Sequence, residues 1–330
     1  QRLFVLGEVV GPTTGEASSL ATFDDFLAAY DAQLGWLLEM AVDGNNRLGE
    51  THRKLKPTPL LSALFQGPME KGRDVIDGGA VHNTTGVANV GVPDVVDSLA
   101  AIKTVVYERG MVDLPSLVEA LDVDFEGHEA LRSALVSKVP KLGDDCELTK
   151  SLAEWVIGRI HARLSAMPHY RGGRYLPGYW SMSNHVAFGL LSGALPSGRR
   201  RGMPFSPGLT PTPSCRASLT DQIRAVAALD TTKMPNNLAF NVKVVPGGLD
   251  DHAAVVDRMA AYVKAYFELG GMQIQFNATS SETFRDAMEH PEDYRDLLVR
   301  ISGYNAYFVE LNRDIQLELI ERMEHSLSSR

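Results

Sequence analysis

The sequence predicts an α/β protein, because segments with helical periodicity alternate along the chain with segments of strand periodicity. Residues 22–42 and 250–269 carry apolar side chains at the three- and four-residue spacing of amphipathic helices. Residues 238–245 and 272–277 instead alternate apolar and polar side chains, as strands do. With 44% hydrophobic and 22% charged residues, the composition is that of a globular protein with ample material for a core.

The first half of the chain is predicted to be mostly helical. Thr22 and the acidic residues that follow it are suited to capping the first helix. A stretch rich in Pro and Gly follows over residues 56–79, and residues 83–90 are expected to form a strand or a loop. Further helices are predicted over residues 94–109, 115–121, 129–136 and 145–167.

The second half is predicted to mix strands, helices and one long loop. Residues 179–190, rich in aromatic and small side chains, are expected to be a strand in a crowded interior. Residues 195–214 are punctuated by Pro, Gly and Ser and indicate a long loop, and Gly270-Gly271 is expected to end the helix before it. Helices are predicted over 218–229, 281–288, 291–298 and 314–325, with a strand or loop over 299–309.

Charge and cysteine content exclude several classes of protein. The net charge of −9 argues against a nucleic-acid binder, which usually has a basic face. Two cysteines, Cys146 and Cys215, make neither a disulfide framework nor a typical zinc site, so no metal is expected and a reducing, cytoplasmic setting fits. No apolar run approaches the roughly 20 residues of a membrane-spanning helix. The opening residues resemble the middle of a longer chain.

A short motif near the C-terminus carries the functional prediction. Arg300-Ile301-Ser302-Gly303-Tyr304 resembles the Arg-Val-x-Gly-Tyr signature of the glycyl radical enzymes, with Ile301 as its only departure. The resemblance covers nearly the whole chain, because it extends through residues 89–103, 177–189, 194–208, 270–277 and 316–322.

The resemblance implies both a fold and a radical carrier. Residues 1–277 would form the second half of a ten-stranded α/β barrel, made of two five-stranded half-barrels, and residues 278–330 the glycyl radical domain. Gly303 would hold the radical on its α-carbon, with Arg300, Ser302 and Tyr304 as its neighbours in the loop.

The chemistry of the motif explains why a glycine is needed. A radical at a glycine α-carbon is delocalised over the flanking amide nitrogen and carbonyl, and a side chain would crowd that planar centre. The loop is expected to be buried while it works, since oxygen and solvent quench radicals. The neighbouring residues are apolar, as fits a loop that docks into a core: Val299, Ile301, Tyr304, Tyr307 and Phe308. The alternative is that Gly303 is an ordinary turn glycine with positive φ.

The resemblance also implies partners rather than a resident cofactor. An activating enzyme that uses S-adenosylmethionine and an iron–sulfur cluster would install the radical. Members of the family are commonly dimers of their large subunit, and those that add a hydrocarbon to fumarate also carry small accessory subunits. The resemblance also implies a cysteine that becomes a thiyl radical and attacks the substrate. In the family this cysteine lies upstream of the segment that resembles Gly11 to Gly15, and neither Cys146 nor Cys215 fits that place. The chain alone is therefore not expected to turn over substrate.

The type of reaction is predicted from three further stretches. Residues 179–189, 204–211 and 236–243 resemble the alkylsuccinate and benzylsuccinate synthases, which add a hydrocarbon C–H bond across fumarate. The alternatives are another glycyl radical lyase, dehydratase or decarboxylase, or a fragment that carries a radical without catalysis. A plain α/β binding protein, in which Gly303 is only a turn residue, belongs to a different class of function.

Residues that the expected strand would align could form a substrate pocket. Trp180, Met182 and Asn184 alternate within the expected strand and could point into one cavity. Trp180 and Met182 suit contact with a hydrocarbon, and Asn184 or Ser302 could meet a carboxylate. The alternative for Trp180 and Met182 is a place in the core, and His185 on the same segment is expected to be structural.

A second set of polar residues could line the same cavity from another strand. Asn83 and Thr84 have side chains that could meet a substrate. The alternative is that they make turn and cap contacts, for which these residue types are well suited.

Overall fold

A computed structural model describes residues 3–5, 8–245 and 252–327 of the chain. The chain divides into two compact units, each of which is described by itself. Unit 1 comprises Gln1–Val87 and Gly158–Pro177, and unit 2 comprises Ala88–Ile157 and Gly178–Arg330.

Unit 1 is built on one long helix, α1 (Phe23–Leu55). The predicted cap is confirmed, because the Thr22 side chain accepts the Asp25 amide N–H and the Asp25 carboxylate accepts the Thr22 N–H. The helix continues well past the predicted end at residue 42, to the residue before Lys56-Pro57. One reason is close packing, since a Cβ at Gly49 would overlap the ring of Tyr170.

The other elements of unit 1 are short. Strands β1 (Leu3–Val5) and β2 (Glu8–Val10) pair antiparallel, and β3 (Thr84–Ala88) pairs with β4 (Arg174–Gly178) at the division between the units. The Pro/Gly stretch contains three short helical turns, α2 (Pro59–Ser62), α3 (Pro68–Lys71) and η2 (Val75–Asp77). Another short turn, η1 (Ala17–Ser19), precedes α1.

The helices at the start of unit 2 confirm the sequence prediction in number and place. The segment predicted as one helix over residues 94–109 is α4 (Val92–Ala101) followed by the π-helical turn η3 (Ile102–Glu108). Its core-facing side chains Val96 and Val105 are fully buried. The remaining helices of this part are α5 (Leu114–Asp122), α6 (Glu129–Ser137) and α7 (Glu147–Ala166), which passes from unit 2 into unit 1.

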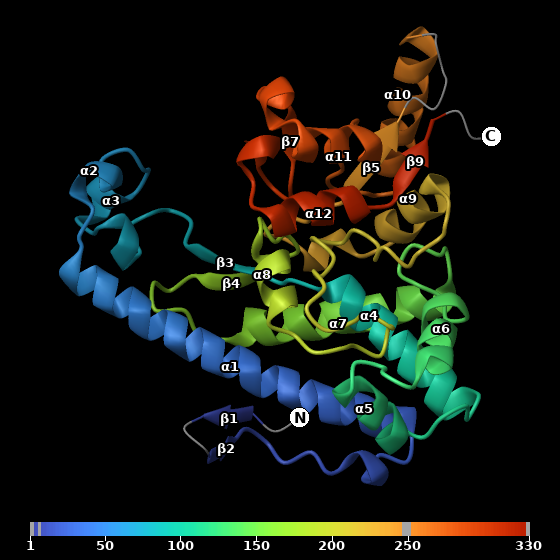
Figure 1. Cartoon of the computed structure of the whole chain (residues 1–330). Helices are drawn as coiled ribbons and strands as arrows, with labels where there is room; N and C mark the ends of the chain where they lie inside the picture. Colours follow the sequence, from blue (N-terminus) through green and yellow to red (C-terminus); the bar gives the residue numbers. More distant parts are fainter. Residues whose placement is uncertain (1–2, 6–7, 246–251, 328–330) are drawn as a thin grey trace. The chain divides into compact units, whose positions relative to one another are not determined.

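A three-stranded parallel sheet lies in the second part of unit 2, with β5 (Asn241–Val245) between β6 (Gln275–Asn277) and β9 (Glu324–Ser326). The first four residues of β5 are buried, as expected for the central strand of a covered parallel sheet. Helices α9 (Leu219–Ala227) and α10 (His252–Glu268) pack against each other beside it (Figure 1). The turn η4 (Thr231–Lys233) precedes β5.

The last part of unit 2 packs two helices around a hairpin, β7 (Leu298–Arg300) and β8 (Asn305–Tyr307). Figure 1 shows α11 (Ser281–Glu289) and α12 (Arg313–Glu321) together with β7 in one group. The short turns η5 (Pro291–Tyr294) and η6 (Phe308–Glu310) flank the hairpin. One buried apolar cluster joins these elements: Val186, Phe284, Ala287, Val299, Ile301, Phe308, Ile315, Leu319 and Ile320.

The strand predicted over residues 179–190 is wrong. Tyr179 makes only an isolated bridge with Leu238, and residues from Asn184 form helix α8 (Asn184–Leu190). The chain turns at Met182, whose φ of 50° lies in the left-handed region and interrupts an extended path. Small and aromatic side chains in this segment were misleading because they pack equally well on a helix of two turns.

Two further boundaries differ from the prediction because tertiary contacts override local propensity. Residues 291–298 form a single turn and then enter β7 at Leu298, rather than one helix. The helix predicted over residues 314–325 ends at Glu321, and the chain then pairs with β5 as β9. Pairing with a buried central strand satisfies the backbone of this last segment.

The predicted mixed α/β class is confirmed. The strands among the described residues form one sheet of three strands and three sheets of two. The boundary placed at residue 277 remains a prediction. Within the described ranges, no helix combines the length and apolar character needed to cross a membrane, and no group of His, Cys, Asp and Glu side chains is arranged to hold a metal ion.

Candidate radical site

Gly303 occupies the tip of the β7–β8 hairpin. Ile301 donates its backbone N–H to the Tyr304 carbonyl at 3.0 Å, which leaves Ser302 and Gly303 as the two turn residues. Gly303 has a φ of 99°, in the left-handed region that glycine adopts without steric cost. The local sequence therefore needs a glycine here for its backbone conformation alone.

The expectation that Gly303 lies buried is wrong for this chain. The residue is exposed, and a Cβ added to it would meet no heavy atom within 4 Å beyond its chain neighbours. It projects from a two-residue turn, a position that its own hairpin cannot cover.

The residues on both sides of Gly303 are nevertheless anchored in the core. Val299 and Ile301 are buried before the turn, and Phe308 is buried after it. Tyr304 packs against the same cluster, whereas Tyr307 is 45% exposed. The prediction of a docked loop thus holds for the flanks of the hairpin and fails for its tip.

Arg300 fixes the base of the hairpin to strand β6. Its backbone N–H donates to Asn277 Oδ1 at 2.8 Å, and its carbonyl accepts from Asn277 Nδ2 at 2.7 Å. Its guanidinium donates to Gln275 Oε1 at 2.7 Å and to Asn305 Oδ1 at 3.1 Å. Arg300 therefore ties the base of the hairpin to β6, and its guanidinium is hydrogen-bonded to side chains of the protein itself.

Ser302 docks the turn onto the loop that precedes α8. Its carbonyl accepts the Met182 backbone N–H at 3.0 Å, and its hydroxyl oxygen accepts the Ser181 N–H at 3.4 Å. Ser302 is fully buried, and Ser181 is 1% exposed. Both oxygens of Ser302 thus face the backbone of this loop, and its predicted meeting with a substrate carboxylate remains untested.

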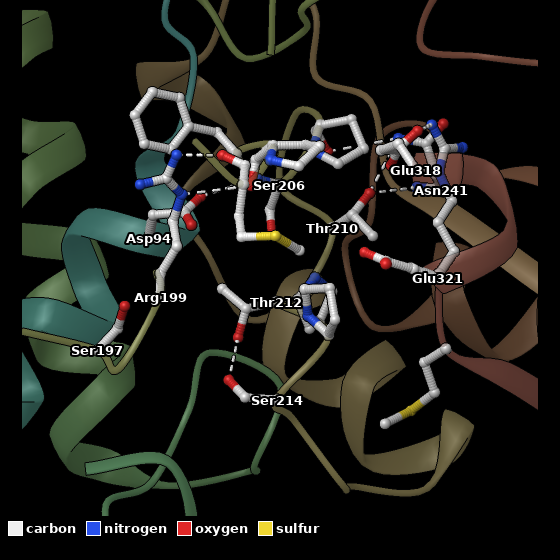
Figure 2. Close-up of a pocket in the computed structure, with 18 of the residues that line it drawn as sticks. Asp94, Ser197, Arg199, Ser206, Thr210, Thr212, Ser214, Asn241, Glu318 and Glu321 are labelled. Atoms are coloured by element: carbon white, nitrogen blue, oxygen red, sulfur yellow. Dashed lines mark hydrogen bonds and ion pairs between the residues drawn. The ribbon is translucent and has the colours of Figure 1, made fainter. Parts of the chain in front are cut away.

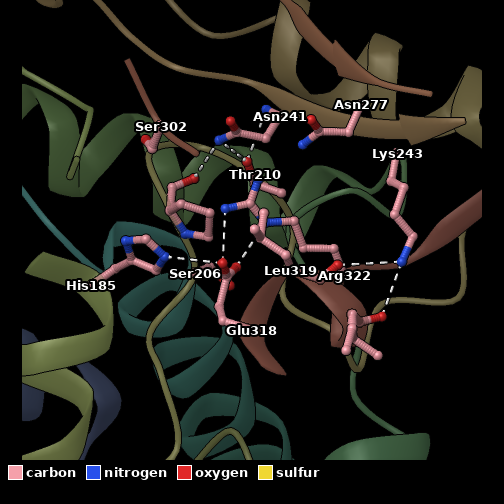
Figure 3. Close-up of polar contacts among 12 residues, drawn as sticks. His185, Ser206, Thr210, Asn241, Lys243, Asn277, Ser302, Glu318, Leu319 and Arg322 are labelled. Atoms are coloured by element: carbon pink, nitrogen blue, oxygen red, sulfur yellow. Dashed lines mark hydrogen bonds and ion pairs between the residues drawn. The ribbon is translucent and has the colours of Figure 1, made fainter. Parts of the chain in front are cut away.

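A buried charged group lies beneath the turn (Figure 3). Ser181 Oγ is 3.0 Å from His185 Nδ1, and His185 Nε2 is 3.3 Å from a carboxylate oxygen of Glu318, close enough for an ion pair but outside hydrogen-bond geometry. Glu318 accepts two hydrogen bonds of 2.8 Å from Arg322. Arg322 in turn donates to the Arg300 carbonyl at 3.4 Å. His185 is fully buried between Ser181 and Glu318.

The electrostatics of this group are dominated by Glu318. Burial by itself would raise the pKa of the Glu318 carboxyl, but the Arg322 guanidinium and the His185 ring outweigh burial and lower that pKa to about 2. The carboxylate is therefore the stable form across the whole range in which the protein would work.

The low pKa of Glu318 predicts a loss of stability in acid. A folded pKa below the unfolded value of 4.5 stabilises the fold fully above pH 4.5, and this contribution disappears as the pH falls from 4.5 towards 2. We expect the effect to reach roughly 3 kcal/mol. Urea unfolding between pH 6 and pH 3, over which about 2 kcal/mol of it is lost, measures it as the difference between the wild-type chain and Glu318→Gln. Equal pH slopes in the two proteins would contradict the assigned ion pair.

A cavity of about 290 Å³ opens within unit 2 beside the same helix α12. Figure 2 shows Asp94 and Arg199 on one side of it and Glu318 and Glu321 on the other. Basic, hydroxyl, amide and apolar side chains make up the rest of the lining, among them Lys243, Arg322, Ser206, Thr210, Asn241 and Phe205.

Two buried aspartates on α4 differ from Glu318 in having raised pKa values. Burial raises the pKa of Asp94 to about 7 and that of Asp97 to about 6. Asp94 accepts the Ser206 N–H at 2.8 Å, and Asp97 accepts from the Leu142 N–H and the Thr212 hydroxyl at 2.7 Å each. Asp94 lines the cavity and can therefore hold or release a proton there near neutral pH.

Lys243, on the central strand, ties α12 to the sheet. Its buried Nζ donates to Ser281 Oγ at 2.6 Å and to the Leu319 and Ile320 carbonyls at the end of α12 at 3.3 and 3.0 Å. Burial lowers the pKa of this amine to about 8. The helix that carries Glu318 is thus held at its C-terminal end by a buried cation.

The predicted substrate residues of the 179–190 segment do not lie on one strand in this structure. Without a strand, Trp180, Met182 and Asn184 lose the alternation that would have aligned them. Met182 is 47% exposed and Asn184 is exposed, and none of the three lines the cavity described above. Contact with a substrate remains a prediction for each.

Asn83 and Thr84, in unit 1, show the turn contacts of the alternative interpretation. Asn83 Nδ2 donates to the Gly78 and Ala80 carbonyls at 3.3 and 3.0 Å. Thr84 is exposed, and its carbonyl accepts from Arg171 at 3.0 Å. Neither contact tests a role in substrate binding.

Cys215 lacks the environment of a reactive thiol. Cys215 is fully buried, and burial raises its thiol pKa to about 12. Cys146 is half-buried, and neither lines the cavity beside α12.

Comparison with known proteins identifies the family. The model of the pyruvate formate lyase-like family matches residues 3–189, and the glycine radical model matches residues 205–309, which include Gly303. This chain belongs to the pyruvate formate lyase-like family of glycyl radical enzymes and carries a glycine radical domain.

Individual relatives support the same assignment. The trans-4-hydroxy-L-proline dehydratase of Clostridioides difficile is 31% identical over 96% of this chain and 40% of its own length. The isethionate sulfite-lyase of Desulfovibrio desulfuricans is 30% identical over 96% of this chain and 39% of its own length. The glycerol-bound B12-independent glycerol dehydratase of Clostridium butyricum superposes with a TM-score of 0.93 at 31% identity, over 98% of this chain and 41% of that chain.

The chain therefore spans about two fifths of the length of the relatives it matches. The superposition confirms the fold expected for the C-terminal part of these enzymes. The exposure of Gly303 describes its surroundings within this chain alone. The relatives are dehydratases and a sulfite-lyase rather than fumarate-adding synthases, so the finer resemblance to that group is not supported.

Sequence analysis missed the residues that anchor the hairpin. Glu318 and Arg322 stand four residues apart, a spacing that signals a helical ion pair, but only the fold reveals that the pair is buried. Asn277 gave no signal, because its partners are backbone groups of Arg300 that are distant in the sequence. Ser181 gave none either, because the Ser302 hydroxyl that accepts its N–H is more than a hundred residues away.

Proposed function

We propose that this chain is the radical-bearing part of a glycyl radical enzyme that eliminates water from its substrate, with Gly303 as the radical carrier. The observation that carries the proposal is the match to the glycine radical model over residues 205–309. Loss of one hydrogen atom from the Gly303 α-carbon would leave a radical stabilised by the flanking amide nitrogen and carbonyl. The exposed α-carbon at the hairpin tip is sterically open to such a step.

Elimination is favoured over fumarate addition by the character of the relatives. Dehydratases stand among them at about 30% identity over nearly the whole chain. The hydrocarbon pocket expected from Trp180, Met182 and Asn184 also loses its basis, because these residues do not lie on one strand. A dehydratase must protonate a leaving hydroxyl, and Asp94, with its raised pKa and its place in the cavity, has suitable chemistry for a proton donor.

A second candidate is the release of sulfite from a sulfonate. Several relatives are isethionate sulfite-lyases, with 28% to 30% identity to this chain. Both candidates are eliminations in which a small group leaves the substrate, so the same radical-bearing domain would serve either.

The proposal includes the partners that the radical needs. We propose that an activating enzyme using S-adenosylmethionine and an iron–sulfur cluster installs the radical after translation. A homodimer, and the rest of the catalytic machinery including a thiyl cysteine, belong to the same proposal.

A substrate screen on the anaerobically activated chain, together with the part of the proposed enzyme that supplies the thiyl cysteine, tests the type of reaction. The candidates are glycerol, 1,2-propanediol, trans-4-hydroxy-L-proline, isethionate, and fumarate together with toluene. We expect loss of water from a hydroxylated substrate, detected by mass spectrometry. Release of sulfite would select the second candidate, and a substituted succinate would return the assignment to the fumarate-adding group.

A further inference from the structure

A closed ring of contacts joins the hairpin of Gly303 to helices α8 and α12. From Ser302 the ring runs through the backbone and hydroxyl of Ser181 to His185, and from His185 to Glu318. From Glu318 it returns through Arg322 to the Arg300 carbonyl, two peptide bonds before Ser302. We infer that Glu318 is a positioning residue that holds this hairpin in place, an inference that rests on the proposed role of Gly303.

The ring reaches the hairpin by two arms, one through His185 and Ser181 and the other through Arg322. Glu318 joins the two arms, because it contacts both His185 and Arg322. One of its oxygens accepts from Arg322 at 2.8 Å, and the other both accepts from Arg322 at 2.8 Å and lies 3.3 Å from His185. One arm ends at the Arg300 carbonyl and the other at Ser302, so both reach the part of the hairpin that precedes Gly303. Removing Glu318 therefore releases both arms at once, whereas removing either neighbour releases only one.

Burial makes the ring hold in an all-or-none manner. The side chains of His185, Glu318 and Arg322 are 0%, 7% and 6% exposed. A buried charge that loses its partner costs far more than an exposed one, because water cannot replace the lost contact. Small displacements of the hairpin are therefore resisted, and a displacement large enough to break the ring separates the hairpin from α8 completely.

Backbone strain at Met182 acts against the ring. Its φ of 50° is rare for a residue with a side chain, and such conformations persist only where surrounding contacts enforce them. The Met182 N–H donates to the Ser302 carbonyl at 3.0 Å, so this contact is one that enforces it. When the hairpin leaves, Met182 is free to relax, which favours the released state once the ring has opened.

The ring thus defines two states of the hairpin, held and released. In the released state Ile301 and Ser302, which precede Gly303, become accessible to a second protein. In the held state Ser302 and Ile301 stay buried. Glu318 sets the balance between the two states without touching Gly303.

Hydrogen exchange of the backbone amides tests this role in the 330-residue chain without any radical. The Met182 amide reports the ring directly, and the amide of Val244, in the central strand β5, reports the stability of the fold. We expect Glu318→Ala to accelerate exchange at Met182 by about tenfold or more relative to exchange at Val244. The matched control is Glu321→Ala, three residues further along α12, because Glu321 is an exposed residue that takes no part in the ring; it should leave the ratio unchanged.

A second variant separates positioning from stability, in case Glu318→Ala folds poorly. In Glu318→Leu/Arg322→Met both charges are replaced by apolar groups, so no buried charge is left unpaired. Protection at Val244 should recover while Met182 remains fast, because the ring is still absent. If Met182 is slow in every variant that folds, or recovers together with Val244, Glu318 only stabilises the fold and the inference is wrong. This result does not depend on whether Gly303 carries a radical, which only the activated protein can show.

Discussion

Gly303→Ala is expected to abolish cleavage of the activated chain by air. A radical on the Gly303 α-carbon reacts with oxygen, and the chain should break there and release a C-terminal peptide that starts near Tyr304. An alanine Cβ crowds the planar radical centre, so this variant should stay intact. Mass spectrometry of the protein before and after exposure to air measures the effect, which we expect to be complete loss of the fragment.

The fold itself should tolerate this change. Open space surrounds the position, so the cost arises from the φ of 99° alone and should be about 1–2 kcal/mol. Gly127→Ala is the matched control, because Gly127 is also exposed, has a φ of 74° and has nothing within 4 Å of its Cβ position. It should suffer the same strain and still be cleaved at Gly303. Cleavage of Gly303→Ala at the same site would exclude Gly303 as the carrier.

Phe308→Ala is expected to cost about 3–5 kcal/mol of unfolding free energy, the range for a fully buried aromatic side chain. The Phe308 ring stacks on Phe284 with centroids 4.7 Å apart and planes 15° apart. It fills the cluster that also holds Val299 and Ile301, so its removal leaves a cavity directly under the hairpin.

Urea unfolding of the whole chain measures this cost. Tyr307→Ala serves as the control, since the adjacent ring is 45% exposed and its loss should cost about 0.5 kcal/mol. If the two substitutions cost the same, the hairpin does not depend on the buried cluster, and the packing described for it is wrong.

The sequence was most informative where periodicity and resemblance agreed. The cap at Thr22, the amphipathic helices and the central strand β5 follow from local pattern, and the structure confirms them. The strand predicted at residues 179–190 failed because a short apolar segment fits a helix or a strand equally well. The final strand β9 was missed because its pairing with β5 spans about eighty residues of sequence.

The candidate site was only partly predictable, for a related reason. The motif around Gly303 is contiguous and could be recognised, whereas the polar residues that hold it come from three separate segments, 181–185, 275–277 and 318–322. A buried ion pair and an exposed one look the same in a sequence, so the role of Glu318 and Arg322 required the fold. The geometry of Gly303 by itself is that of a turn glycine. The assignment as a radical carrier therefore rests on the family match.

Electron paramagnetic resonance of the anaerobically activated protein tests that assignment most directly. The protein would be prepared with glycine carrying ¹³C at the α-carbon, and a radical at Gly303 predicts a doublet from its single α-hydrogen with additional splitting from the label. A silent spectrum with an activating enzyme that works on a known partner, or a signal indifferent to the label, would contradict the account.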